Sequence, residues 1–100
     1  MLTGLAHGRY FSFEKIDLTG IKQVELGFQD SEKLLIGTTV EIRVGSASGE
    51  IIGSGLVGEK TVVEISKTNG WQNVFFVFKN EKEQEKEIGL LDWVLFDDGL

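Results

Sequence analysis

The chain has 100 residues, with 16 acidic against 10 basic side chains and a net charge of −6. This balance argues against nucleic acid and anionic membrane partners, because such surfaces require clustered cationic side chains and the basic residues here are interspersed among acids. The chain has no cysteine, which excludes disulfides and thiolate metal sites, and no run of about 18 apolar residues that could cross a membrane.

Short alternating runs rich in β-branched residues, separated by turn residues, predict an all-β chain. The first expected strand, Gly8 to Lys15, places Phe11 and Phe13 on one face. The segment Asp17-Leu18-Thr19-Gly20 predicts a turn after it, because an aspartate can bond nearby backbone groups and a glycine readily adopts a positive φ.

Six further strands are expected in chain order, each bounded by polar or glycine-rich segments. They span Lys22–Gln29, Thr38–Val44, Ile51–Val57, Thr61–Ser66, Trp71–Lys79 and Ile88–Phe96. Seven short strands with frequent turns predict a single β-sandwich domain over residues 1–100. We expect this domain to be part of a larger protein.

The residues needed for catalysis are scarce. The one histidine, His7, lies near the N-terminus and is interpreted as a terminal surface residue, and the mixed charges of 81–87 predict a solvated loop. A glycosidase needs two facing carboxyl groups, and Asp92 is the only acid set within an apolar strand. The sequence therefore predicts a protein that is not an enzyme.

Asp92 lies between Leu91 and Trp93 in the closing strand. A buried ionised carboxylate is costly unless it is paired or bound to a metal. The alternative is that strand alternation turns Asp92 to solvent, or toward a backbone or lysine partner. Trp93, inside the same apolar run, is expected in the core.

Seven of the ten aromatic residues are phenylalanines, which favour burial and cannot bond a hydroxyl. Trp71 differs, because it follows the turn residues Asn69-Gly70 and precedes Gln72 and Asn73. An indole ring can pack against the C–H face of a sugar while neighbouring amides bond its hydroxyls. Trp71, Gln72 and Asn73 are therefore candidate carbohydrate-binding residues, with Tyr10 as a further one. A Trp71 that only caps the end of the sandwich is the alternative.

Five segments carry a resemblance to a known family. They are Phe13–Ile21, Glu41–Ser46, Glu50–Gly53, Val74–Lys79 and Gly89–Phe96, and the strands Gly8–Phe13 and Gly70–Lys79 align with two motifs of that family. In this order and spacing, the chain resembles the family 6 carbohydrate-binding modules, which are non-catalytic β-sandwiches of jelly-roll type appended to secreted glycan-active enzymes. The resemblance runs from about Gly8 to Phe96 and covers the later three-quarters of such a module.

The resemblance implies a plant or algal type polysaccharide or oligosaccharide as partner and an extracellular location. It also implies a structural calcium ion with Asp92 among its ligands, although calcium takes six to eight oxygens and one aspartate cannot suffice. The segment Met1 to Gly8 has neither the charged region nor the apolar block of a signal peptide.

The chain departs from the family where the family binds sugar. Gly4 or Leu5 stands at the position of an aromatic residue, the loop Gly58-Glu59-Lys60 replaces a longer one with tryptophan, and Leu90 replaces an asparagine. One reading is that sugar binds elsewhere, for instance on the concave sheet face. The other is a structural or protein-interaction domain that has lost sugar binding. Its exposed sheet edges would then pair with a neighbouring domain or another subunit.

Overall fold

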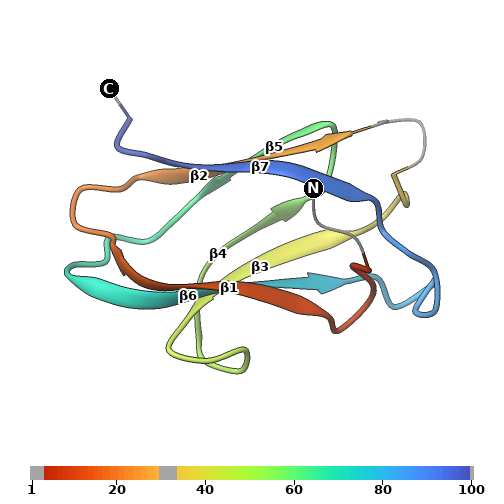
Figure 1. Ribbon diagram of the computed structural model, residues 1–100, viewed down its shortest axis with the longest axis horizontal. Helices are drawn as coiled ribbons and strands as arrows, with labels where there is room; N and C mark the ends of the chain where they lie inside the picture. Colours follow the sequence, from red (N-terminus) through yellow and green to blue (C-terminus); the bar gives the residue numbers. More distant parts are fainter. Residues whose placement is uncertain (1–3, 30–33, 100) are drawn as a thin grey trace.

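The computed structural model describes residues 4–29 and 34–99, which form seven strands and contain no helix that could cross a membrane. The strands are β1 (Tyr10–Asp17), β2 (Gln23–Gln29), β3 (Thr39–Val44), β4 (Glu50–Leu56), β5 (Lys60–Glu64), β6 (Trp71–Lys79) and β7 (Leu90–Asp97), as drawn in Figure 1. All seven predicted strands are present, with bounds that differ from the prediction by at most two residues.

The strands form two antiparallel sheets. One has four strands in the order β1-β6-β3-β4, and the other has three in the order β5-β2-β7. Figure 1 shows the two sheets as layers facing one another. The predicted all-β sandwich is therefore confirmed.

Aromatic side chains from β6 join the two layers. Phe76 and Phe78 are fully buried on the inner face of β6. Phe76 stacks on Phe11 of β1, with ring centroids 4.8 Å apart, and meets Phe96 of β7 edge-on at 6.2 Å. Phe78 meets Phe28 of β2 at 6.3 Å. Edge-to-face pairs of this kind add about 0.5–1.5 kcal/mol each beyond their buried area.

The predicted turn after β1 is confirmed in detail. The backbone N–H of Thr19 donates to Asp17 Oδ1 at 3.0 Å, and Gly20 has a φ of 82°. Before this turn, β1 carries a bulge between Phe13 and Ile16, in which Lys15 has a φ of 54°. A non-glycine residue in this region is strained, so the bulge must be held by other contacts.

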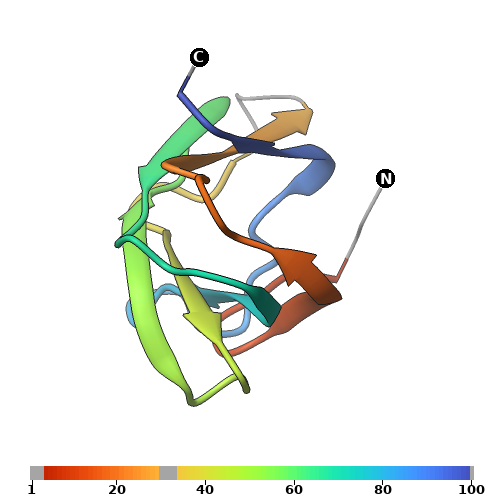
Figure 2. The same ribbon diagram turned by 90° about the vertical axis from the view of Figure 1, so that its left-hand side faces the viewer.

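The two sides of the sandwich differ. On one side β4 and β5 lie together, because Ser66 N–H donates to Ile52 O at 2.7 Å and a Cβ on Gly53 would stand 2.5 Å from Glu64 O. On the other side the outermost strands are β1 and β7 (Figure 2). There the rings of Phe13 and Phe96 meet edge-on at 5.9 Å.

Two isoleucines on opposite faces of the four-stranded sheet test this assignment of the core. Ile42 is fully buried on the inner face of β3, whereas Ile51 is exposed on β4. We expect Ile42→Ala to lower the free energy of unfolding by about 2–5 kcal/mol, since it removes buried methylenes and leaves a cavity. The matched change Ile51→Ala should cost less than about 1 kcal/mol in urea denaturation. Equal losses would contradict the assignment of faces.

Candidate functional site

The outer face of the four-stranded sheet gathers aromatic and charged side chains. Register places Tyr10 opposite Val77 and Val77 opposite Glu41, so these residues form one row across β1, β6 and β3. The next row runs from Ser12 through Phe75 to Arg43. We call the set Tyr10, Phe75, Glu41, Arg43 and Lys79 the sheet-face site.

Tyr10 supplies the aromatic surface of the sheet-face site. Its side chain is 52% exposed, and its ring lies 5.6 Å from that of Phe75 at an interplanar angle of 57°. Successive side chains of a strand point to opposite faces, so Phe11 and Phe13 of β1 point inward and Tyr10 points outward. The site therefore offers one phenol ring held in place by a second, partly buried ring.

A charged pair lies beside the rings. Arg43 Nε and Nη2 donate to Glu41 Oε1 at 3.2 and 2.9 Å, and Arg43 Nη1 donates to the backbone oxygen of Gly49 at 2.7 Å. The two side chains are 19% and 21% exposed. Both hydrogen bonds from Arg43 to Glu41 use the same carboxylate oxygen, Oε1. Charge-assisted bonds of this kind are stronger than neutral ones and fix the geometry of both side chains.

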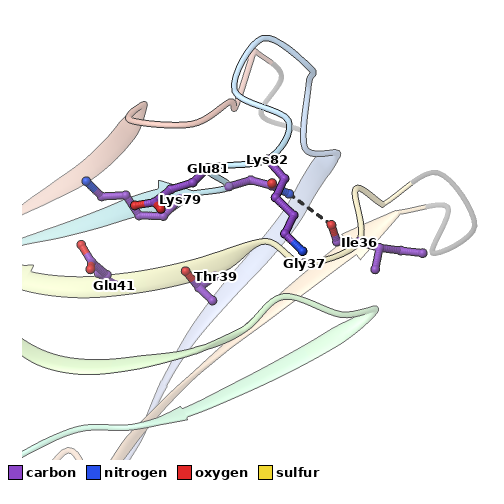
Figure 3. A pocket seen from close by; sticks show the side chains of 8 residues that line it. Ile36, Gly37, Thr39, Glu41, Lys79, Glu81 and Lys82 are labelled. Carbon is purple, nitrogen blue, oxygen red and sulfur yellow. Dashed lines mark hydrogen bonds between the residues drawn. The ribbon is translucent and has the colours of Figure 1, made fainter.

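The sheet-face site continues into a hollow where β6 ends and β3 begins (Figure 3). The hollow has a volume of about 530 Å³. Its lining comprises Ile36, Gly37, Thr39, Glu41, Lys79, Asn80, Glu81 and Lys82. Glu41 thus belongs to both the charged pair and the hollow, and the polar lining suits a hydroxyl-bearing ligand.

Asn80 fixes the wall of this hollow. It is buried, and its Nδ2 donates to Ile36 O at 3.1 Å and to Thr38 Oγ1 at 2.9 Å. Its backbone N–H donates to His7 Nδ1 at 2.9 Å. The interpretation of His7 as a terminal surface residue is therefore wrong, because this half-buried imidazole ties the N-terminal segment to β6.

Trp71, Asn73 and Tyr10 share the outer face, as proposed from the sequence, but they do not form one cluster. Tyr10 and Trp71 lie at opposite ends of the β1–β6 pairing, about 20 Å apart at roughly 3.3 Å per residue. Trp71 is 71% exposed. Asn73 is exposed and uses Oδ1 to accept the N–H of Lys15, so it also holds the β1 bulge.

Gln72 occupies the alternate position on β6. It is half-buried, it pairs with Ile16, and its Nε2 lies 3.5 Å from the backbone oxygen of Asn69. Strand alternation therefore separates Gln72 from the outer face that carries Trp71 and Asn73. The structure adds four residues to the candidate site: Glu41, Arg43, Phe75 and Lys79. In the sequence, the alternation of β3 and β6 already indicated that these side chains point outward.

The loop end of the sandwich has a smaller hollow of about 190 Å³. Among the described residues it is lined by Leu34, Leu35, Ile36, Gly37, Leu56, Val57, Gly58 and Glu59. This lining contains no aromatic ring and one charged side chain. The exposed rings of Tyr10 and Trp71 and the Glu41–Arg43 pair lie on the sheet face instead.

Asp92 and Trp93 lie on β7 at a bulge, where Trp93 pairs with Gly27 and Leu91 pairs with Phe28. Asp92 is exposed, so alternation and the bulge turn it to solvent. Within 4–29 and 34–99, no three Asp, Glu, His or Cys side chains gather as a metal-binding group. The calcium ion stays a prediction that unfolding in calcium and in EDTA would test.

The expectation that Trp93 belongs to the core is wrong. Its side chain is 42% exposed on the outer face of the three-stranded sheet. A Cβ on Gly27 would stand 2.2 Å from Trp93 Cε2, so the indole lies flat against the glycine of β2. The sequence did not indicate this outward position, because the residues around Trp93 on β7 are all apolar and show no alternation with polar residues.

Comparison with solved structures identifies this arrangement of strands. A β-1,3-glucan-binding family 6 module from Bacillus halodurans superposes with a TM-score of 0.78 at 20% identity, over 95% of this chain and 74% of the other. The chain has the fold of a family 6 carbohydrate-binding module. A family 6 module from Clostridium cellulolyticum in complex with xylose gives a TM-score of 0.77 at 23% identity, over 95% of this chain and 76% of that one.

A larger protein contains the same fold. The family 43 arabinoxylan arabinofuranohydrolase from Bacillus subtilis, in complex with cellotetraose, matches with a TM-score of 0.79 at 20% identity. The match covers 95% of this chain but 20% of the hydrolase. No family model and no curated protein matches the sequence. At these identities, the likeness to the family 6 modules establishes the fold.

Loss of the Asn80 side chain should destabilise the wall of the hollow. Asn80→Ala leaves the buried Thr38 hydroxyl without its donor, and we expect a loss of about 1–3 kcal/mol in the free energy of unfolding. Asn69→Ala, at an exposed turn, should stay within about 0.5 kcal/mol in the same urea titration. Similar values for both variants would contradict the bonds assigned to Asn80.

Proposed function

We propose that this chain is a non-catalytic carbohydrate-binding module that binds a plant or algal type polysaccharide on the outer face of its four-stranded sheet. The observation that carries the proposal is the juxtaposition of the exposed Tyr10 ring with the Glu41–Arg43 pair and Lys79. The extracellular location expected for such a module is part of the same proposal, since these polysaccharides lie outside cells.

The ring and the charged groups have complementary tasks. One face of a pyranose carries C–H groups that pack on an aromatic ring, and Tyr10 presents such a ring backed by Phe75. The sugar hydroxyls then need donors and acceptors at the edge of the ring. Arg43 and Lys79 can donate to them, and Glu41 can accept from them. The hydrogen bonds within the Glu41–Arg43 pair hold these groups before a ligand arrives, which lowers the entropy cost of binding.

The length of the face favours a chain over a single sugar. Trp71 stands at the far end, about 20 Å from Tyr10 along the strands at roughly 3.3 Å per residue. An extended glycan that packs on Tyr10 can therefore reach Trp71 only if it contains several rings. The solved modules with this fold support the ligand class, because one of them binds β-1,3-glucan and another forms a complex with xylose.

A second function, that of a protein-interaction domain, is favoured by a different observation. Trp93, Leu95 and Val62 are large apolar residues exposed on the three-stranded sheet, opposite the sheet-face site. The two functions use separate faces and do not exclude each other.

Ligand length should separate the roles of Tyr10 and Trp71. We expect Tyr10→Ala to weaken binding of both polysaccharide and short oligosaccharide at least tenfold, equivalent to about 1.4 kcal/mol. Trp71→Ala should weaken binding of the polysaccharide alone. Affinity electrophoresis against xylan, β-glucans, agar-type galactans and mannans, followed by calorimetry with oligosaccharides of the retained type, measures both effects.

The chain offers a matched control in its other tryptophan. Trp93→Phe lies on the opposite sheet and should leave glycan binding within about twofold of the parent, since a surface change away from a site shifts energies by a few tenths of a kcal/mol. Retention that survives Tyr10→Ala, with folding shown by circular dichroism, would contradict the sheet-face site. Absence of retention on every glycan would contradict the proposed function.

A further inference from the structure

Between Trp93 and Phe96, the closing strand β7 is apolar on both of its faces. Along Trp93, Val94, Leu95 and Phe96, alternate side chains point to the outer face and to the interior of the sandwich. A strand with this composition is typical of the centre of a sheet, where both faces and both edges are covered. Yet β7 stands at the end of the order β5-β2-β7.

The other three outermost strands carry features that discourage pairing. β1 has a bulge with Glu14 and the strained Lys15, and β5 lies against β4 through the bond from Ser66 N–H to Ile52 O. β4 is interrupted by Gly53 and Gly55. Bulges, charges and coverage are the devices by which sheets protect their edges. On β7 the bulge and the acids lie at Asp92, Trp93 and Asp97, and among residues 4–29 and 34–99 none of these devices protects the run from Val94 to Phe96 between them.

The hydrogen-bond pattern shows which groups of β7 face the open side. Phe28 N–H donates to Glu59 O at 3.0 Å, so within β2 the even-numbered residues direct their backbone groups toward β5. The odd-numbered residues of β2 then direct their backbone groups toward β7. Their partners on β7, Trp93 and Leu95, form the hydrogen bonds between these two strands. The N–H and C=O groups of Val94 and Phe96 therefore point away from the sheet.

The interior beside this edge is also accessible. Phe13 of β1 is partly exposed at the same side of the sandwich, and its ring meets that of Phe96 at 5.9 Å. Figure 2 shows β1 and β7 together on this side, opposite β4 and β5. An added strand beside β7 would place every second side chain against the rings of Phe13 and Phe96.

We propose that the free edge of β7 binds an extended polypeptide segment that adds a fourth strand to the three-stranded sheet. The main-chain bonds come from Val94 and Phe96, and apolar side chains of the segment cover Phe13 and Phe96 on the inside and Leu95 on the outside. Acids mark both ends of the apolar run, Asp92 before it and Asp97 after it. The segment therefore alternates apolar residues and carries lysine or arginine at its ends.

A second copy of this chain does not fit the edge. In an antiparallel pair that uses both outward-facing residues, Val94 stands opposite Phe96 of the other copy, and the acids Asp92 and Asp97 that flank each apolar run then come near one another. Like charges on adjacent strands destabilise a strand pair. The net charge of −6 on each copy acts in the same direction.

Amide hydrogen exchange on the intact chain tests the proposal directly. The probe is a synthetic peptide of alternating valine and threonine with two lysines at each end. We expect the amides of Val94 and Phe96 to exchange rapidly in the free chain and at least tenfold more slowly with the peptide. Those of Trp93 and Leu95 should be slow in both. A peptide with glutamates in place of the lysines should give no protection.

Two matched variants locate the contact. Leu95 and Val62 flank Glu25 from opposite sides and are each 48% exposed. Leu95→Lys should weaken peptide binding at least tenfold, whereas Val62→Lys, with the same added charge on β5, should stay within twofold. Unprotected Val94 and Phe96 amides, equal effects of the two variants, or protection that rises with chain concentration without peptide would each overturn the proposal. Glycan binding is not used in these measurements, so its success or failure is judged separately.

Discussion

The contacts that Phe76 and Phe78 make across the sandwich determine most of what this chain presents to its surroundings. Phe76 meets Phe96 and Phe78 meets Phe28, so β6 is bound to the opposite sheet through two rings. The period of a strand is two residues, and a slip by one residue would move both rings to solvent. The core therefore fixes the register of β6 strongly.

The register of β6 in turn assembles the sheet-face site. With Phe76 inside, Phe75 and Val77 face outward, and the neighbouring strands bring Tyr10 and Glu41 to either side of Val77. Val77 is buried although it lies on the outer face. The site is therefore a packed surface whose side chains support one another, and it needs little rearrangement to receive a ligand.

The sequence predicts the strands well because their signal is local. Alternation in β1, β3 and β6 shows which residues point inward, and Asp17 with Gly20 marks the turn. The association of Tyr10 with Glu41 and Arg43 could not be predicted in this way, because it depends on β6 lying between β1 and β3. The outward position of Trp93 was missed for a second reason. Its run on β7 is apolar throughout, and the space for the indole comes from Gly27 on another strand.

The central claim is that glycan binds on the sheet face, and an NMR titration of the labelled chain tests it most directly. With an oligosaccharide of whichever polysaccharide retains the chain, we predict amide and side-chain shift changes at Tyr10, Glu41, Arg43 and Lys79. Trp71 should respond only to the longer oligosaccharides. Changes confined to Gly58, Glu59 and Leu90 at the loop end, or the same changes in Tyr10→Ala as in the parent, would contradict the claim.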